Sequence, residues 1–144
     1  MADTIDSNSK KSNHDSEQVI VVTAEPTKFT IKGEVTAWGF TGEMELDVSQ
    51  SNNIIKISTL RYKFGGSNRS RNPIFRVICP SQVELTRTPT KDNQWHNWAS
   101  SEDTHVSKGT TYRFVFIFDA PPPGEGPIIS DYTDVTFAIG KPPQ

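Results

Sequence analysis

The side chains best suited to hold a ligand are two tryptophans and a histidine in the stretch Gln94-Trp-His-Asn-Trp98. The segment around them, residues 90 to 107, is mostly polar, so Trp95 and Trp98 have few apolar neighbours in sequence. An indole ring offers a large apolar area and an N–H donor, which suits sugar rings, flat ligands or the centre of a protein interface. We therefore predict ligand binding at Trp95, His96 and Trp98. The alternative is that one or both tryptophans fold back to cover the end of the core.

A second candidate site is a run of basic residues between Asp47 and Glu84, which contains no acidic residue although the chain's net charge is -2. Arg69 and Arg71 lie in a glycine-flanked loop within it, where two guanidiniums could bind a sulfate, phosphate or carboxylate in bidentate fashion. The alternative is that the basic side chains pair with acids on neighbouring strands. The acids expected to face outward are Glu43, Glu45 and Asp47. Because the total charge is negative, we do not expect nucleic acid as the main partner.

Catalytic signals are absent from the sequence. Neither GxSxG nor HExxH occurs. Cys79 is the one cysteine, which excludes an intramolecular disulfide, and it lies on the inward phase of an apolar strand, where a thiol is inert. Some nitrogen and oxygen ligands occur close together in sequence, but their spacing is poor for a metal site. These are His96, Glu102, Asp103 and His105. We expect no enzymatic activity, no catalytic residue, no cofactor and no metal.

The elements that must position these residues are β-strands, and the clearest one runs from Tyr112 to Phe118. Its alternation sends four aromatic side chains to one side and Arg113, Val115 and Ile117 to the other. Both sides are mostly apolar, which is typical of a strand in the middle of a sheet with its second face at least partly covered.

Seven further segments have the composition of strands, and no helix pattern of ordinary length occurs. We expect these strands at 19–22, 29–38, 44–48, 54–64, 74–79, 83–85 and 135–139, with turns at 39–42, 49–53 and 65–73. We predict no strand in the polar segment 90–107. Within 54–64 the apolar residues change from odd to even positions, which predicts a β-bulge near Ser58 and Thr59.

About eight or nine short strands predict an all-β fold, an antiparallel β-sandwich, with a β-barrel as the alternative. Tyr112, at the start of the central strand, has the position of the tyrosine corner in immunoglobulin-like sandwiches, which the chain resembles in broad architecture. We predict a single domain over 18–144. Residues 1–17 are mostly polar, and after Met1 their one sizeable apolar residue is Ile5, so we predict a disordered tail there.

The function expected from these features is recognition without catalysis. A lectin-like, adhesion or toxin-like module would bind a carbohydrate, an anionic ligand or another protein through the aromatic segment and the arginine loop. The alternative is a structural or assembly subunit without a small ligand. The chain shows neither a secretory signal nor an apolar run long enough to span a membrane, so we expect a cytoplasmic protein or one exported without a cleaved signal.

Overall fold

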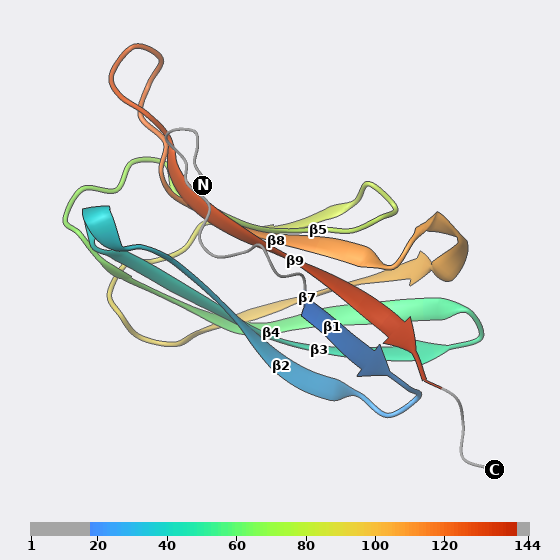
Figure 1. Cartoon of the computed structure of the whole chain (residues 1–144). Helices are drawn as coiled ribbons and strands as arrows, with labels where there is room; N and C mark the ends of the chain where they lie inside the picture. The colour runs from blue at the N-terminus through green and yellow to red at the C-terminus, as the bar shows by residue number, and fades with distance from the viewer. Residues whose placement is uncertain (1–17, 141–144) are drawn as a thin grey trace.

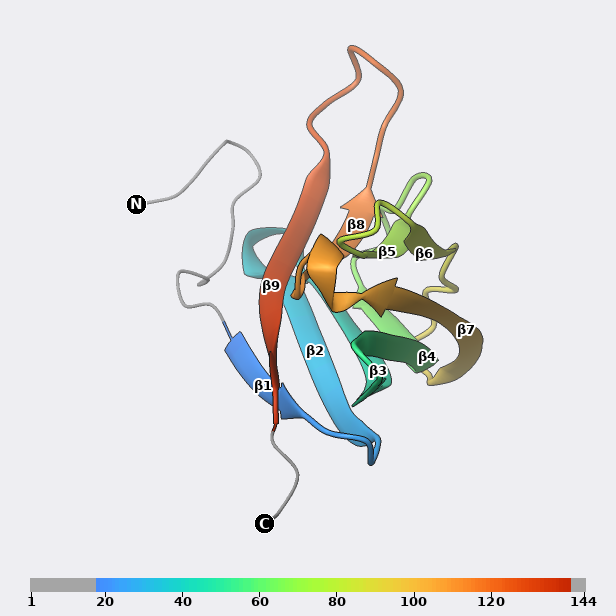
Figure 2. The same cartoon turned by 90° about the vertical axis from the view of Figure 1, so that its right-hand side faces the viewer.

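Strand β8 (Thr111–Asp119) lies in the middle of a five-stranded sheet, as its two apolar faces predict. The computed structural model describes residues 18–140, which form two sheets packed face to face (Figure 1, Figure 2). The larger sheet has the order β1-β9-β8-β5-β6, and the smaller has the order β2-β3-β4-β7. The predicted β-sandwich is confirmed, and the sheets do not close into a barrel. The predicted tail at 1–17 lies outside the described residues.

The remaining strands have the following bounds. In the larger sheet they are β1 (Gln18–Val22), β9 (Ile129–Ile139), β5 (Ile74–Ile78) and β6 (Glu84–Arg87). In the smaller sheet they are β2 (Thr27–Val35), β3 (Phe40–Ser51), β4 (Ile54–Gly66) and β7 (His96–His105). Two short 3-10 turns, η1 (Thr36–Trp38) and η2 (Val106–Lys108), join strands. In the described part of the chain no helix is long and apolar enough to cross a membrane.

The core between the sheets is dominated by aromatic rings from β8. Phe116 projects into a hollow on the smaller sheet formed by two glycines that face each other across β2 and β3, Gly33 and Gly42. A Cβ atom on Gly42 would lie 2.7 Å from the Phe116 ring, and one on Gly33 would overlap the same ring. Phe118 stacks on Phe40 with ring centres 5.3 Å apart. The aromatic strand therefore fixes how the two sheets sit on each other.

The predicted β-bulge is present in β4. Glu45 pairs with Arg61 while the next residue, Leu46, pairs with Thr59, so Leu60 is the extra residue. The register between β4 and β7 shifts at the same place. Because the bulge changes the phase, Tyr62 points into the core and Arg61 lies on the outer face of the sheet.

Three details differ from the sequence prediction. The turn after β2 is formed by η1 and Gly39, which has a φ of +74°, and not by residues 39–42, since β3 already begins at Phe40. The polar segment 90–107 contains a complete strand, β7, at the edge of the smaller sheet. Finally, β1 pairs with β9 in parallel, whereas every other strand pair is antiparallel in the described residues.

Candidate functional site

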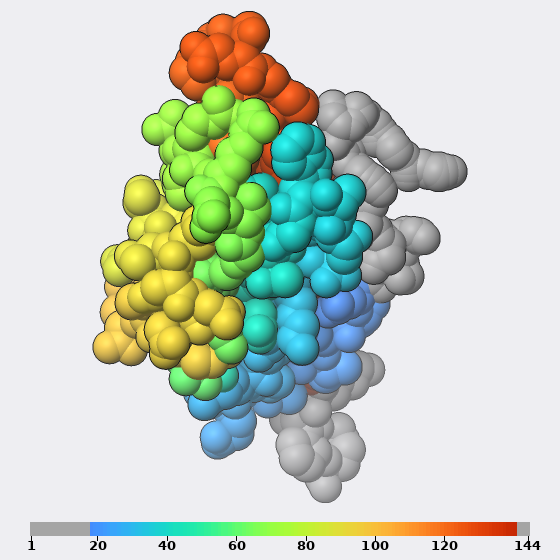
Figure 3. All heavy atoms as spheres, turned by 90° about the vertical axis from the view of Figure 1, so that its left-hand side faces the viewer, coloured from blue at the N-terminus to red at the C-terminus, as the bar shows by residue number. Residues whose placement is uncertain are grey.

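Four connections between strands meet at one end of the sandwich and form a continuous surface (Figure 3). They are η1 with Gly39 (cyan), residues 67–73 (green), residues 88–95 (yellow) and residues 120–128 (orange). We call this surface the loop end. Four of the predicted ligand residues lie at or beside it, and the fifth, Trp98, lies within β7. The four are Arg69, Arg71, Trp95 and His96.

Arg69 and Arg71 both bind Asp119, the last residue of β8. The Arg71 guanidinium donates from Nε and Nη2 to the two carboxylate oxygens of Asp119 at 3.1 and 3.0 Å. The Arg69 Nε lies 3.3 Å from Asp119 Oδ2. The Asp119 side chain is buried, and although burial alone would raise its pKa, the hydrogen bonds and charge of Arg71 outweigh this and hold the pKa below its ordinary value. The two arginines are therefore committed first to a carboxylate of their own chain.

The backbone of the arginine loop is fixed by the same contact. The Arg71 N–H donates to Asp119 Oδ1 at 2.7 Å, and the Ser70 hydroxyl donates to the carbonyl of Phe118 at 2.8 Å. The N–H of Ala120 in turn donates to the Arg71 carbonyl at 2.6 Å. Sequence reasoning missed Asp119 because it assigned the acids of β3 as partners. Only Arg61 follows that expectation, with its Nε 2.7 Å from Glu45 Oε1.

Trp98 is a core residue. Its side chain is 3% exposed, and its backbone carbonyl accepts a hydrogen bond from the Thr59 hydroxyl at 2.6 Å. The structure thus places Trp98 in the position that the sequence left open as the alternative, and a ring buried in the core offers no surface to a ligand. Cys79 is also buried, and burial raises the pKa of its thiol to about 12. Trp98 therefore drops out of the candidate site, and Cys79 is buried as the inward phase of its strand predicts.

His96 is held by two partners in the protein. Its ring stacks on Tyr62 with centres 5.2 Å apart, and its Nε2 lies 2.9 Å from both carboxylate oxygens of Asp92. The hydrogen bond from His96 holds the pKa of Asp92 below its ordinary value. The Thr90 N–H donates to the Tyr62 hydroxyl at 2.8 Å. These contacts anchor the 88–95 segment, which carries Trp95.

Trp95 keeps a partly exposed ring at the loop end, next to two cations from β4. The Arg61 guanidinium carbon lies 4.2 Å from the ring centre and the Lys63 ammonium 5.6 Å. Both distances are within the reach of a cation–π interaction. Lys63 takes part in none of the ion pairs found between residues 18 and 140. Its charge is therefore available to a ligand.

Trp38 is a further surface aromatic at the loop end, and sequence reasoning did not select it as a candidate. Its side chain is 40% exposed in η1, with the Arg69 guanidinium carbon 5.4 Å from the ring centre. The sequence placed Trp38 on the outward phase of a continuous strand. The glycine that follows, Gly39, could have indicated that the strand ends before Trp38. In the structure Gly39 has a positive φ and completes the turn.

The two tryptophans are connected along β4. Lys63 contacts Trp95, and the Ser67 N–H donates to the carbonyl of Gly39, next to Trp38, at 3.2 Å. Ser67 directly follows β4 and is four positions after Lys63, which in an extended chain is roughly 13 Å. Between them Phe64 points into the core, and Gly65 and Gly66 carry no side chain. The Asn93 side chain lies against Gly65, with its Oδ1 2.7 Å from the place a Cβ atom would take. An aromatic ring with a neighbouring guanidinium therefore lies on either side of the two glycines.

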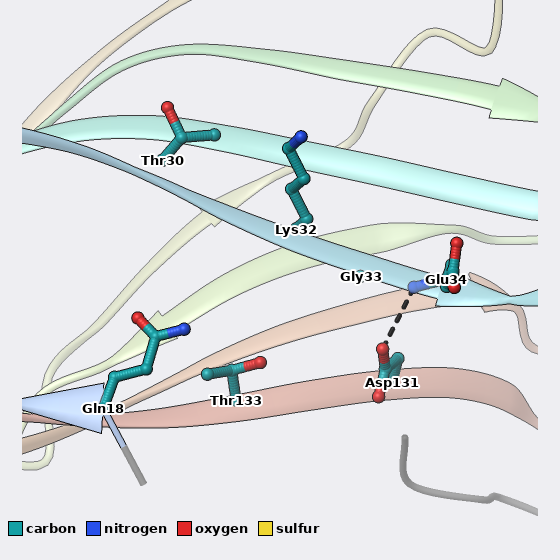
Figure 4. Close-up of a pocket in the computed structure, with 7 residues that line it drawn as sticks. All are labelled: Gln18, Thr30, Lys32, Gly33, Glu34, Asp131 and Thr133. Atoms are coloured by element: carbon teal, nitrogen blue, oxygen red, sulfur yellow. Dashed lines mark hydrogen bonds between the residues drawn. The ribbon is translucent and has the colours of Figure 1, made fainter. Parts of the chain in front are cut away.

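A groove also opens along the side of the sandwich, between β2 and the strands β1 and β9 (Figure 4). Its volume is about 400 Å³. Asp131 of β9 reaches across its narrow end, where Oδ2 accepts a hydrogen bond from the Glu34 backbone N–H at 3.0 Å. The groove is lined by Gln18, Thr30, Lys32, Gly33, Glu34, Asp131 and Thr133. These groups can form hydrogen bonds and ion pairs, and they include no histidine or cysteine.

Metal binding has no support in the part of the chain that the structure describes, where no group of three or more histidine, cysteine, aspartate or glutamate side chains is arranged to hold an ion. No protein-family model, no curated protein and no solved structure matches this chain. A function for this chain must therefore be inferred from the geometry of the loop end.

Proposed function

We propose that this protein is a non-enzymatic recognition domain, lectin-like in its mode of binding, which holds an anionic oligosaccharide across the loop end. The observation that supports the proposal best is the pairing of two surface tryptophans with cations. Trp95 lies beside Arg61 and Lys63, and Trp38 lies beside Arg69. Such pairs place an apolar surface and a positive charge next to each other.

This arrangement suits a ligand that is both cyclic and acidic. An indole ring buries the apolar face of a sugar, while its N–H remains a donor. A carboxylate or sulfate on the sugar binds a guanidinium or ammonium group. Arg61 and Arg69 remain 42% exposed despite their ion pairs, so they can accept a further anionic partner. Lys63, beside Trp95, and Ser67, bonded to Gly39, are roughly 13 Å apart along the extended chain, and two aromatic–cation pairs on either side of this interval favour an oligosaccharide over a single sugar.

The proposal is tested by following the three indole N–H signals in a proton–nitrogen NMR spectrum during titration with a sulfated oligosaccharide. We expect the Trp38 and Trp95 signals to move, and the buried Trp98 signal to serve as an internal reference that stays in place. A neutral oligosaccharide of the same length should bind more weakly, because it lacks the groups that contact the cations.

The variants Trp38→Ala and Trp95→Ala should each weaken binding at least tenfold, about 1.4 kcal/mol. Arg113→Ala is the matched control, because Arg113 also stacks on a ring, at 4.2 Å from Tyr132, and pairs with a carboxylate, but on the other sheet. Its affinity should equal that of the wild type. The proposal fails if no glycan shifts the two surface indoles, or if both tryptophan variants bind as well as the control.

A structural or assembly role is the second candidate function, and one observation favours it. Val19 and Val21 on the edge strand β1 are 64% and 59% exposed, and this edge could pair with another chain. Binding of a glycan by a chain that remains monomeric would contradict assembly as the only function.

A further inference from the structure

The edge of β2 that points away from β3 carries unpaired backbone groups. The Glu34 N–H donates to Asp131 Oδ2 on the larger sheet at 3.0 Å, so it points away from β3. The register between β2 and β3 is continuous, and in such a ladder every second residue directs its N–H and C=O to the same side. Lys28, Thr30 and Lys32 therefore direct theirs to this edge. The N–H groups of Thr30 and Lys32 have no acceptor among residues 18 to 140.

The groove beside this edge lies where the smaller sheet is one strand short. The larger sheet has five strands and the smaller has four, and β2 packs on β9 and β8, so in the described chain the smaller sheet offers no fifth strand opposite β1. Gln18 of β1 and Thr133 of β9 line the groove on one side, and β2 lines it on the other (Figure 4). Ile20 of β1 points the same way as Gln18 and is only partly buried. A strand added to β2 would cover Ile20 and fill the groove.

The side chains at the edge of β2 favour an acidic partner. Lys28 and Lys32 are four residues apart and exposed on the outer face of the smaller sheet. Their register neighbours on β3 are Asp47 and Glu43, yet neither lysine takes part in an ion pair formed within residues 18–140. Lysines on an edge strand hinder pairing with an uncharged or basic strand. Acidic side chains on an added strand would pair with them across the ladder.

We propose that an extended acidic segment of another protein adds to the edge of β2 as a fifth strand of the smaller sheet. Its carbonyls accept hydrogen bonds from the N–H groups of Thr30 and Lys32, and its N–H groups donate to the carbonyls on the same edge, as in other cases of strand addition. Two acidic residues four positions apart face Lys28 and Lys32, and the side chains next to them in sequence enter the polar groove. The segment ends before Glu34, whose N–H is already bonded. The groove shares no residue with the loop end, so this inference is independent of the proposed function.

The test uses the full chain labelled with nitrogen-15 and the synthetic peptide acetyl-Thr-Glu-Thr-Thr-Thr-Glu-Thr-amide, with the same peptide carrying lysine in place of both glutamates for comparison. We expect the glutamate peptide to slow hydrogen exchange of the Thr30 and Lys32 amides about tenfold or more at saturation. The lysine peptide should leave both amides unchanged. The Ile31 amide is the internal reference, because its N–H points to β3 and is protected with or without peptide.

Two variants test the charge and the backbone separately. Lys32→Glu should weaken binding of the glutamate peptide about tenfold or more and allow the lysine peptide to bind. Lys56→Glu is the matched control, because it makes the same charge change on the same outer face but within β4, away from the edge, and its affinity should equal that of the wild type. Thr30→Pro removes one edge N–H without interrupting the ladder to β3, and it should also weaken binding about tenfold or more.

The proposal is wrong if the glutamate peptide leaves the Thr30 and Lys32 amides unprotected, or if both peptides protect them equally. Slow exchange of these two amides in the chain without peptide also overturns it, because residues 1–17 or a second copy would then already cover the edge. If circular dichroism shows that Lys32→Glu does not fold, Lys28→Glu takes its place, since Lys28 is exposed on the same edge. An affinity equal to that of the wild type in this variant contradicts the proposal.

Discussion

Asp119 determines the role of the arginine loop. The sequence presents Arg69 and Arg71 as two free guanidiniums, but one buried carboxylate binds both of them. A buried carboxylate is stabilised only where charge and hydrogen bonds replace the water it has lost. The arginines thus serve the fold first, and Arg69 serves the proposed ligand through the part of its guanidinium that remains exposed beside Trp38.

Replacement of Asp119 by Asn should lower the free energy of unfolding by about 2–3 kcal/mol at neutral pH, less than a fully buried ion pair because the guanidiniums are partly solvated. The pKa of Asp119 is lowered in the folded state, so its contribution is present above the unfolded value of about 3.9 and is lost as the pH falls through the folded pKa. Urea titrations at several pH values should therefore show the wild type and the variant converging below about pH 4. Parallel pH curves for the two proteins would contradict this account.

The three tryptophans show what sequence can and cannot establish about single residues. The composition around Trp95 and Trp98 predicted a ligand site at both rings, with burial of one or both as the alternative, and the structure leaves only Trp95 partly exposed. Burial of Trp98 depends on the phase of β7, in which Trp98 and Thr104 face inward. The sequence does not indicate which residues of β7 face inward, because most of the inward positions are polar. Trp38 was expected on the outward face of a strand, and the structure places it in η1 instead, with its ring beside the Arg69 guanidinium.

At the scale of elements, the bulge in β4 links the core to the proposed site. One extra residue, Leu60, lets Tyr62 and Phe64 enter the core while Arg61 and Lys63 reach Trp95 on the other side. The period of two allows no other way to change phase, which is why the sequence predicted the bulge. Strand β7 was missed for the opposite reason: an edge strand with a polar outer face and few apolar inner residues has no clear period.

Gly33→Ala should destabilise the protein by about 1–3 kcal/mol, because the added methyl group overlaps the Phe116 ring. Phe116→Leu alone should also be destabilising, through loss of packing. In the double variant the smaller side chain makes room for the methyl group, so the two effects should fall short of their sum by at least about 1 kcal/mol. Urea denaturation of the four proteins measures this coupling. Strict additivity would show that Phe116 does not occupy the space above Gly33.

At the scale of the whole molecule, the sequence predicted the two-layer fold but not the way in which its ends meet. Alternation along 29–35 and 112–118 is a local property, and it identifies inward faces and a central strand. Pairing of the first strand with the last is a property of residues more than 100 positions apart, such as Gln18 and Val135. The alternation of apolar and polar residues along one strand does not indicate which distant strand it will pair with. The loop end has the same origin, since four distant connections form it.

A chain that begins at Thr23 should be less stable than the full chain by at least about 2 kcal/mol. It loses the buried side chain of Val22 and the whole ladder between β1 and β9, and it exposes the edge of β9. The control begins at Gln18 and keeps that ladder, so its thermal unfolding should match the full chain. Equal melting of the two truncated chains would show that β1 contributes nothing to stability.

The parallel pairing of β1 with β9 also determines how the domain responds to force. Both strands run in the same direction, and the chain enters β1 at Gln18 and leaves β9 after Ile139. Tension between these two points pulls the strands past each other along their length. All hydrogen bonds of the ladder are then loaded at once, whereas an antiparallel hairpin pulled from its open end would break them one after another. We therefore expect the domain to resist tension between Gln18 and Ile139 more strongly than it would if these two strands formed an antiparallel pair.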